Sequence, residues 1–477
     1  MASTFANRDT NWVMRAGGSE LNGGGFDSTV TNAGTNYCDQ DAAQLSLTDI
    51  TTAGASATIG SVAGGFTAAM IGNVLRLASG TNFTPDYYVV TAVASANAAT
   101  LDRVCSTGVG SAGVGRIGGA HAHIKSYATS SGSGANNPLL ATPLIGGNTI
   151  NIRGGGTLDP GVSDYDFSTD YWNFPSGDNT NGSLKITGYN GRPRISTRGL
   201  LIFSGDYIWV RNISFYQSDP TWTTHCTFDQ NTVSYYNCIF DVAGNDAQVA
   251  QFGNGSNNSG SMLCCELRNT GGGALGGSNF GVKFNHGGGL LYGTWIHGLR
   301  SMGVLATGCY GALHNCLING NLGDGYKDDE TDGSAPIPMI VMNTTFNANG
   351  GHGMNFAADA LNNMTIINNI ISNHVGASKF GINFADTYKL NTQKYKYLFG
   401  FNDYFGNTTN FNTVSSVVTW TINPVSDGPL VGDLTLDPGY TNAGGNNFTP
   451  GANVAKVGLA HYAMTTAYKI NMGGVFT

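Results

Sequence analysis

Charged residues are scarce in this chain. Only 11% of its 477 residues are charged, and the formal net charge is -8 at pH 7, whereas about a quarter of the residues are charged in an average soluble domain. An acidic balance with few basic residues disfavours nucleic acid or an anionic membrane surface as a partner, so we expect neither. The hydrophobic share of 41% is ordinary, and the low charge therefore does not indicate disorder.

Long apolar runs are also missing. No stretch approaches the roughly 18 apolar residues that cross a bilayer, so the sequence predicts no membrane insertion. Residues 1–10 lack the basic segment and apolar core of a Sec-type signal peptide. A protein that ends up outside a cell can still be made in a cytosol and released by lysis.

The cysteines lack the spacing of a metal site. Of the eight cysteines, six lie between Cys226 and Cys316, and none forms a CxxC pair. Zinc sites need ligands at characteristic short spacings, so no zinc site is expected. Free cysteine usually behaves as a small buried hydrophobic residue, and we expect these six in the core.

Two short repeats run in step through the centre of the chain. In the first, an asparagine is followed three residues later by an apolar residue. In the second, a glycine directly precedes an apolar residue and recurs at intervals of 22 or 28 residues. The asparagines are Asn212, Asn237, Asn315, Asn343, Asn368 and Asn402, and the glycines are Gly281, Gly303, Gly325, Gly353 and Gly381. Repeats of about 20 to 50 residues mark solenoids, propellers or arrays, whose units must stack to bury their apolar faces.

The repeats predict an all-β fold, a right-handed parallel β-helix. Each unit carries short strands rich in Val, Ile and Phe, with Asn-Gly and Gly-Gly turns and no helical periodicity. A propeller needs four antiparallel strands in each blade, and a leucine-rich repeat needs a leucine pattern that this chain lacks. With about 4.8 Å between coils, the asparagines are expected to form a hydrogen-bonded ladder. The glycines are expected to supply a bend with positive φ.

Changes of composition along the chain predict four parts. The glycine-rich residues 108–119 are interpreted as a linker, and residues 121–127 as a short helix that closes the solenoid. The inserted module is expected to contain four antiparallel strands. The parts are an opening strand and glycine turn at 1–40, the inserted small antiparallel β module at 41–118, the parallel β-helix at 119–394, and the last coil with a C-terminal cap at 395–477.

Five segments resemble the right-handed parallel β-helix superfamily, which includes pectate-lyase-like enzymes and bacteriophage tailspikes. The segments are Val13–Gly23, Ile186–Pro193, Asp437–Tyr440, Asn447–Ala452 and Tyr468–Val475. The likeness covers most of the chain outside the inserted module. It is specific for the fold and weak for activity, because one fold hosts many functions.

The predicted β-helix, the missing signal peptide and the additional β module near the N-terminus favour a structural virion protein of a tailed bacteriophage. Such a protein would be a tail fibre, a tailspike or a head decoration protein, with host surface glycan as its expected ligand. Two alternatives stay open. One is a polysaccharide lyase or glycoside hydrolase on a β-helix scaffold, and the other is a secreted filament-forming adhesin. The first interpretation places the protein in the virion, beside other virion proteins, after synthesis in the host cytoplasm. The adhesin would be extracellular.

The densest charge lies in the run Asp324–Gly333, on a coil that is longer than the one before it. Three interpretations are open: a solvated turn on a bulging loop, a calcium loop, or a carboxylate pair for glycoside cleavage. Asp328, Glu330 and Asp332, followed by a glycine, fit the start of a calcium loop, in which hard oxygens surround a tight turn. Met339 stands where an EF-hand has its last glutamate. Calcium is therefore the only cofactor considered.

Asp324, His352 and Asp328 are the candidates for catalysis. Asp324 and His352 each precede a repeat glycine on adjacent coils, which predicts that they lie close enough for an ion pair or an acid-base partnership. A structural pair is the favoured interpretation. In the same register Asp328 lies between Ala306 and Phe356, so the several carboxylates of a polygalacturonase-like site are missing. We therefore lean towards a protein that is not an enzyme.

Aromatic residues near the C-terminus predict assembly. Residues 395–477 contain Tyr395, Tyr397, Phe399, Phe401, Tyr404, Phe405 and Trp420. One terminal coil needs fewer rings for its own core, and aromatic residues are enriched where chains meet. We expect a homo-oligomer, a trimer by resemblance to tailspikes. The alternative is that the rings only fill the last coil.

Overall fold

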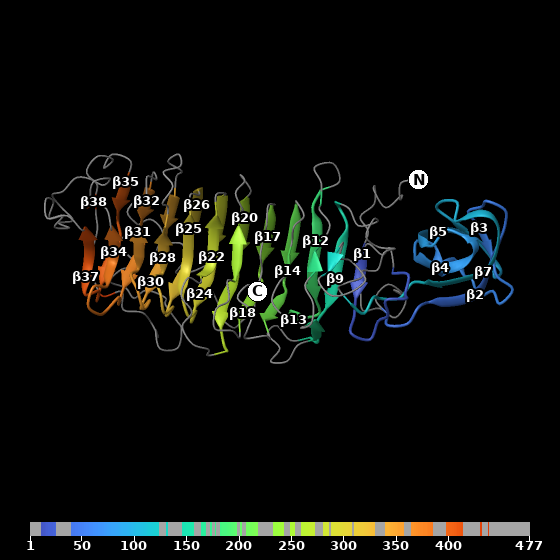
Figure 1. The fold of residues 1–477 in the computed structure, drawn as a ribbon, viewed down its shortest axis with the longest axis horizontal. Coiled ribbons are helices and arrows are strands. Elements are labelled where there is room, and N and C mark those ends of the chain that lie inside the picture. The colour runs from blue at the N-terminus through green and yellow to red at the C-terminus, as the bar shows by residue number, and fades with distance from the viewer. Residues whose placement is uncertain are drawn as a thin grey trace. The chain divides into compact units, whose positions relative to one another are not determined.

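The chain divides into two compact units, which are described separately. Figure 1 shows the strands of the chain with their labels. The first comprises residues 1–195 and 202–213, and the second residues 196–201 and 214–477. The computed structural model describes residues 11–24, 40–123, 130–131, 146–156, 164–167, 172–173, 177, 182–197, 201–202, 207–217, 232–242, 249–252, 259–271, 280–285, 288–307, 310–329, 339–356, 364–384, 397–413, 430–431 and 437.

Regular structure in these ranges is β-strand, apart from one turn of 3₁₀-helix, η3, at Ala68–Met70. The prediction of an all-β chain is therefore confirmed. Across the part of the chain that is described, no helix has the length and apolar character needed to cross a membrane.

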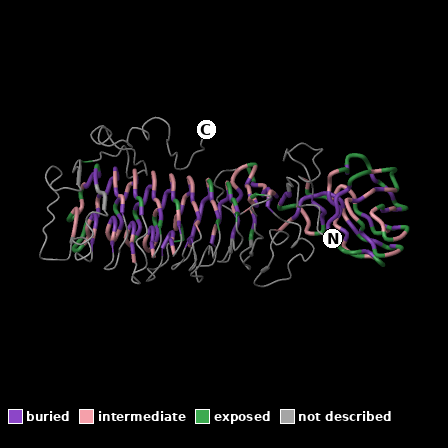
Figure 2. The backbone as a smooth tube through the Cα atoms, turned by 90° about the horizontal axis from the view of Figure 1, so that it is seen from above, coloured by how far each residue is buried: buried purple, intermediate pink, exposed green. Residues whose placement is uncertain are grey.

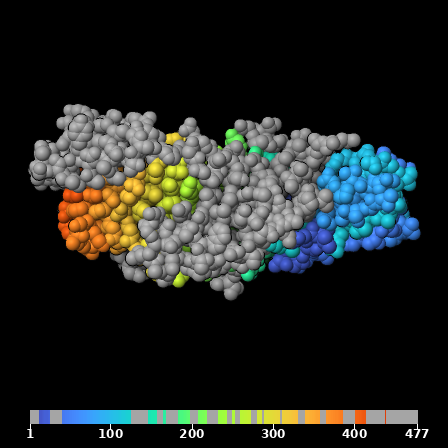
Figure 3. All heavy atoms as spheres, viewed as in Figure 1, coloured from blue at the N-terminus to red at the C-terminus, as the bar shows by residue number. Residues whose placement is uncertain are grey.

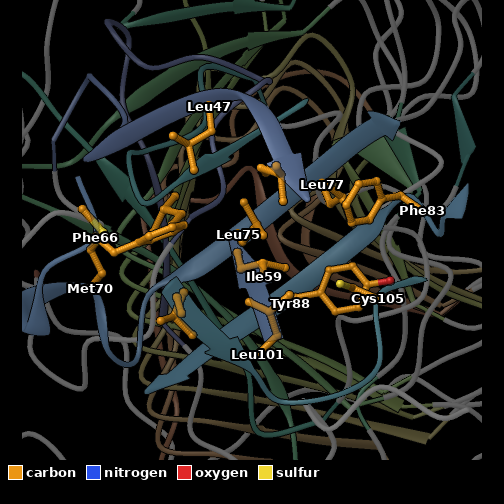
Figure 4. Packing of buried hydrophobic residues seen from close by; sticks show 14 residues of the cluster. Leu47, Ile59, Phe66, Met70, Leu75, Leu77, Phe83, Tyr88, Leu101 and Cys105 are labelled. Carbon is orange, nitrogen blue, oxygen red and sulfur yellow. The ribbon is translucent and has the colours of Figure 1, made fainter. Parts of the chain in front are cut away.

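The first unit contains a closed antiparallel barrel. Its six strands follow the order β2-β3-β6-β5-β4-β7. Apolar side chains alternate inwards and fill the barrel, among them Ile59, Leu75, Tyr88 and Leu101 (Figure 4). The strands are β2 (Leu45–Ala53), β3 (Thr58–Gly60), β4 (Val74–Phe83), β5 (Asp86–Ser95), β6 (Ala98–Leu101) and β7 (Ser106–Ile117). The module thus has six strands rather than the four expected from its sequence.

The expected linker at residues 108–119 is wrong, because most of it belongs to β7. Its glycines let neighbouring strands pack closely. A Cβ on Gly113 would lie 2.7 Å from a ring carbon of Phe83 and 2.8 Å from the Cβ of Ile50. The glycines allow close packing of strands here. A glycine-rich composition alone does not distinguish such a strand from a flexible linker.

The barrel is inserted between two strands that pair with each other. Strand β1 (Asn11–Met14) pairs in parallel with β9 (Thr149–Arg153), and β12 (Leu184–Tyr189) and β15 (Ile208–Arg211) follow in the same sheet. His121 forms an isolated parallel bridge with Met14, so the expected helix does not begin there. Residues 124–127 of that prediction lie outside the described residues.

The second unit is a parallel β-helix whose coils each contribute a strand to three sheets. Successive coils follow one another as bands from yellow to red in Figure 3, and buried positions recur along the strands in Figure 2. Pairing is in register, so like side chains stack: the rings of Phe356 and Phe384 lie 4.7 Å apart.

The strands of each sheet are as follows. The first sheet contains β17 (Val233–Tyr236), β20 (Ser259–Leu263), β23 (Gly288–Tyr292), β26 (Tyr310–His314), β29 (Met339–Met342), β32 (Met364–Ile367), β35 (Tyr397–Gly400) and β38 (Leu430–Val431). The second contains β16 (Ser214–Gln217), β18 (Ile239–Val242), β21 (Glu266–Asn269), β24 (Trp295–His297), β27 (Leu317–Asn319), β30 (Thr345–Asn347), β33 (Ile370–Ser372) and β36 (Asp403–Phe405). The third contains β19 (Ala250–Phe252), β22 (Phe280–Asn285), β25 (Met302–Thr307), β28 (Tyr326–Asp328), β31 (Met354–Phe356), β34 (Phe380–Phe384) and β37 (Thr409–Thr413). The remaining short strands in the described ranges are β8 (Ser130–Ser131), β10 (Tyr165–Phe167), β11 (Trp172–Asn173), β13 (Arg194–Thr197) and β14 (Leu201–Ile202).

The repeat asparagines occupy the turn between the first and second sheets, and they carry its positive φ. Asn315, Asn343 and Asn368 have φ values of 56°, 55° and 62°. Asn368 Nδ2 donates to Asn343 Oδ1 at 3.0 Å, and Asn343 Nδ2 lies 2.9 Å from His314 Nε2. Asparagine suits this place because it tolerates the left-handed region and can bond to the next coil.

Asn402 does not belong to this column. Phe401, with φ 57°, takes the left-handed position of the last described turn. Asn402 lies one residue later, in a buried column where Asn369 Nδ2 donates to Asn402 Oδ1 at 3.0 Å. The expected placement of Asn402 is therefore wrong by one residue.

The repeat glycines do not supply the bend that was expected of them. They are absent from the positions with positive φ. Instead, a Cβ on Gly303 would lie 2.6 Å from the carbonyl oxygen of Gly325, and one on Gly325 would lie 2.6 Å from that of Gly353. Glycine is required because adjacent coils approach too closely for any side chain.

Two replacements of Asn343 should separate the contribution of its side-chain hydrogen bonds from that of its left-handed backbone conformation. Asn343→Gly keeps the left-handed turn and removes the side-chain bonds, which should lower the free energy of unfolding by roughly 1–3 kcal/mol. Asn343→Ala should lose about 1–2 kcal/mol more, because alanine is strained at positive φ. Urea unfolding of the parent and both variants measures this. An Asn343→Gly variant as stable as the parent would contradict a structural ladder.

Candidate functional site

Asp324 and His352 lie on adjacent coils, just before β28 and β31. Asp324 Oδ1 accepts a hydrogen bond from the backbone N–H of His352 at 2.6 Å, and Asp324 Oδ2 accepts one from Asn355 Nδ2 at 2.8 Å. The carboxylate thus bonds to the main chain of His352 rather than to its imidazole. This arrangement holds the turn of the next coil, and the catalytic roles of both residues stay predictions.

The imidazole of His352 is held as a neutral hydrogen-bond donor. Its Nδ1 accepts the backbone N–H of Phe380 at 3.1 Å, and its ring stacks on that of Phe380 with a centroid distance of 5.2 Å. Burial lowers the pKa of His352; the Asp324 carboxylate opposes this shift, and Lys379 adds to it. With Nδ1 accepting, the proton resides on Nε2, so the ring can donate to a ligand but is poorly suited as a base.

Asp328 lies inside the coil. It is fully buried in β28 and pairs in register with Ala306 and Phe356, the neighbours predicted from the repeat. Asp328 therefore belongs to a strand, and not to the bulging loop that was considered for the acidic run. Glu330 and Asp332 lie outside the described residues, so the calcium site stays a prediction. Within the described ranges, no three His, Cys, Asp or Glu side chains gather as metal ligands would.

A polar ladder follows the outer face of the third sheet. Asn412 Nδ2 donates to Asn383 Oδ1 at 2.7 Å, and Asn383 Nδ2 donates to Asn355 Oδ1 at 2.8 Å. The bond from Asn355 to Asp324 completes the series, so every amide donates towards the same carboxylate. An amide has two N–H donors and two acceptor positions, and the ladder uses one of each in Asn355 and Asn383. The second N–H donor and the second acceptor position of each amide can bond to a ligand.

Lysines extend the same face. Lys283 and Lys327 share a register column with Asn355, with Leu305 between the two lysines. Lys327 Nζ lies 3.1 Å from Asp329 Oδ2. We call this surface the third-sheet face; it comprises Lys283, Leu305, Asp324, Lys327, Asp329, His352, Asn355, Lys379, Phe380, Asn383 and Asn412.

Sequence reasoning missed the ladder. Asn355 and Asn383 each stand two residues after a repeat glycine. This recurrence could have predicted the ladder, but the turn asparagines recur more often and drew the interpretation to themselves. Asp324 and His352 were found because both directly precede a repeat glycine.

An ion network lies on the second sheet. Arg268 Nε is 3.1 Å from Asp241 Oδ2, and Arg268 Nη1 and His297 Nε2 lie 3.3 Å and 3.0 Å from Glu266 Oε1. Burial raises the pKa of Glu266, but the bonds from His297 and Arg268 outweigh it and leave the pKa lowered. Because each carboxylate has a cationic partner, this network holds three coils together, and we assign it a structural role.

Comparison with family models and with curated protein sequences finds no match. Among solved structures, the chain is similar to a rhamnogalacturonan lyase, with 13% identity over 66% of this chain and 88% of that chain and a TM-score of 0.35. It is also similar to a pectate lyase, with 14% identity over 65% and 76% and a TM-score of 0.33. A third structure is the catalytic unit of a GH87 alpha-1,3-glucanase from Streptomyces thermodiastaticus, with 10% identity over 82% and 86% and a TM-score of 0.30.

The predicted parallel β-helix is confirmed by the structure itself, in which the strands of the second unit pair in parallel in three sheets. Polysaccharide lyases and glycoside hydrolases are thus among the structural neighbours, and nothing in the comparisons indicates a virion protein. The virion location and the trimer stay predictions, and most of residues 395–477, on which the trimer rests, lie outside the described ranges.

Proposed function

We propose that the protein binds an acidic linear polysaccharide along the third-sheet face. The observation that carries the proposal is the ladder from Asn412 to Asp324, which runs from coil to coil. Its amides repeat at about 4.8 Å, close to the length of one sugar unit in an extended chain. Sugar hydroxyls both donate and accept hydrogen bonds, as the spare positions of these amides do.

Charge on the same face favours an acidic polymer. Lys283 and Lys327 are two coils apart, which corresponds to about 10 Å, and Lys379 lies near His352. Both oxygens of Asp324 are engaged, and Asp329 pairs with Lys327. Among the described residues of this face, three ammonium groups stand against two carboxylates, and a local excess of positive charge attracts anions.

The described groups support binding rather than cleavage. A lyase needs a base beside the sugar, and a hydrolase needs a carboxylic acid and a second carboxylate. His352 presents a donor, Asp324 is hydrogen-bonded through both oxygens, and Asp328 faces the core. Cleavage by a lyase or hydrolase remains the second candidate, which the same assays examine.

Replacing the lysines should weaken binding. Lys327→Met and Lys283→Met should each lower the affinity for polygalacturonate or polymannuronate about five-fold, or about 1 kcal/mol, and added salt should shrink the difference. Affinity electrophoresis measures the change. Lys185→Met, on β12 of the first unit, is the matched control and should bind like the parent.

The proposal fails if the parent binds neither polymer, or if all three variants bind alike. Viscosity and the ultraviolet absorbance of newly formed double bonds should be recorded in the same samples. A fall in viscosity with new double bonds would show a lyase, and new reducing ends without them a hydrolase.

A further inference from the structure

We propose a second carbohydrate site, a groove on the outer face of the first sheet that takes an uncharged sugar. The groove has a volume of about 470 Å³ and is lined by residues of, or next to, β17, β20, β23, β26 and β29 of the second unit. Of these strands, Figure 1 labels β17, β20 and β26. Ligand pockets commonly measure about 300–1,000 Å³, are mostly apolar and contain a few placed polar groups. The groove lies on another sheet than the third-sheet face and does not depend on the function proposed for that face.

The groove arises from small residues that stand beside large ones along one register column. Ser234, Ser261, Leu290, Ala312 and Ile340 follow one another on successive coils. The serines and Ala312 leave space, whereas Leu290 and Ile340 project and are 38% and 39% exposed. The column therefore forms a hollow bounded by apolar walls.

Tyr310 forms a further wall because its ring lies across the previous coil. The ring fills the space that a side chain at Gly288 would need, and Gly288 pairs in register with Tyr310. The tyrosine remains 39% exposed. A flat ring fixed in this way offers an apolar surface to the face of a sugar ring.

The floor of the groove is main chain supported from inside. Phe252 fills the space that a side chain at Gly260 would take, and Phe284 does the same at Gly289. These two rings stack, with centroids 5.9 Å apart. The groove is therefore backed by packed core, and binding would need little ordering, which favours affinity.

The polar groups of the groove suit a sugar hydroxyl. Ser261 Oγ donates to Ser234 Oγ at 2.8 Å. Ser234 keeps its own proton for donation, and Ser261 keeps its lone pairs for acceptance. The residues that line the groove carry no charged side chain, so an uncharged sugar fits and an acidic one would lack a counter-charge. A second protein chain would need about 800 Å² of contact on each side, more than a hollow of this size offers.

The test compares sugar binding by two variants. One places a larger side chain in the groove, and the other places a larger side chain outside it. The probes are cellohexaose, mannohexaose and xylohexaose, and saturation-transfer NMR measures their binding. Ala312→Leu should lower affinity at least ten-fold for whichever probe the parent binds. Thr365→Leu, one coil beyond Ile340 in the same column, should bind like the parent, and so should Lys327→Met.

Ser261→Ala is the second variant and should lower affinity without filling the groove, so the test remains decisive if Ala312→Leu melts at a lower temperature. The proposal is overturned if the parent binds none of the probes, or if neither groove variant weakens binding. Light scattering provides the other contrary outcome: an oligomer that Ala312→Leu converts to monomers would assign the groove to a second copy of the chain. Because Lys327→Met affects only the third-sheet face, the two proposals can fail separately.

Discussion

Gly325→Ala should strongly destabilise the second unit. The added Cβ would lie 2.6 Å from the carbonyl oxygen of Gly353, and 2.8 Å from both Asn349 Nδ2 and Phe346 Cδ1. The next coil and the core both fix these atoms, so the coils must separate. Overpacking a core lowers the free energy of unfolding by about 1–3 kcal/mol. Because the added Cβ would meet main chain on one side and the core on the other, we expect a loss of about 3 kcal/mol here.

The matched control is Gly320→Ala, in the same coil. Gly320 has φ 61° and open space around its Cβ position, so alanine there should cost only the strain of positive φ, about 1–2 kcal/mol. Urea unfolding monitored by circular dichroism compares the two. Equal losses would show that close approach between coils is not the reason for glycine at position 325.

Acid should destabilise both units through buried histidines. Burial lowers the pKa of His374 to about 4; the bond to Asn407 opposes this shift, and His352 and Lys379 add to it. Burial likewise lowers the pKa of His121 in the first unit to about 4. In the unfolded chain a histidine titrates near pH 6.5. As pH falls below 6.5, the unfolded state therefore takes up protons first and stability declines until about pH 4, where the folded state also becomes protonated.

The contacts of His374 explain why it stays neutral. Its Nδ1 lies 2.9 Å from Asn407 Oδ1, and Asn349 Nδ2 lies 3.3 Å from its Nε2. A proton on Nε2 would face the amide donor of Asn349. A shift of about 2.5 pH units corresponds to about 3 kcal/mol for each histidine.

Unfolding free energies from pH 8 to pH 4 test this, with the transitions of the two units followed separately because two-state behaviour is not assured for such a chain. His374→Gln removes the titrating group and should flatten the pH dependence of the second unit, even if it lowers stability at pH 8. The first unit, which retains His121, should keep its slope and serves as the internal control. Parallel curves for parent and variant in the second unit would rule out His374 as the cause.

The spacing of the repeats determined which residues lie one coil apart. Counting from Gly303 to Gly325 to Gly353 placed Ala306, Asp328 and Phe356 in one column, and the strands pair in that register. A stacked fold makes this inference possible, because a residue and its equivalent in the next repeat must be neighbours. The adjacency of Asp324 and His352 followed in the same way.

The sequence could not determine which repeat residue bends the chain. Both Asn and Gly tolerate positive φ, and only the stacked structure shows that Asn315, Asn343 and Asn368 adopt it. Glycine at 303 and 325 is needed instead for close approach between coils. Asn402 matched the repeat by composition, yet it lies one residue past the left-handed position.

Tertiary packing also decided the two candidate surfaces. The third-sheet face depends on which side of each strand points outwards: Lys327 does, and Asp328 points inwards. The groove depends on Tyr310 lying over Gly288 and on Phe284 filling the space beneath Gly289. These contacts depend on the directions of the side chains, which the spacing of the repeats does not determine. Counting repeats therefore predicted the order of the coils but not the shape of their surface.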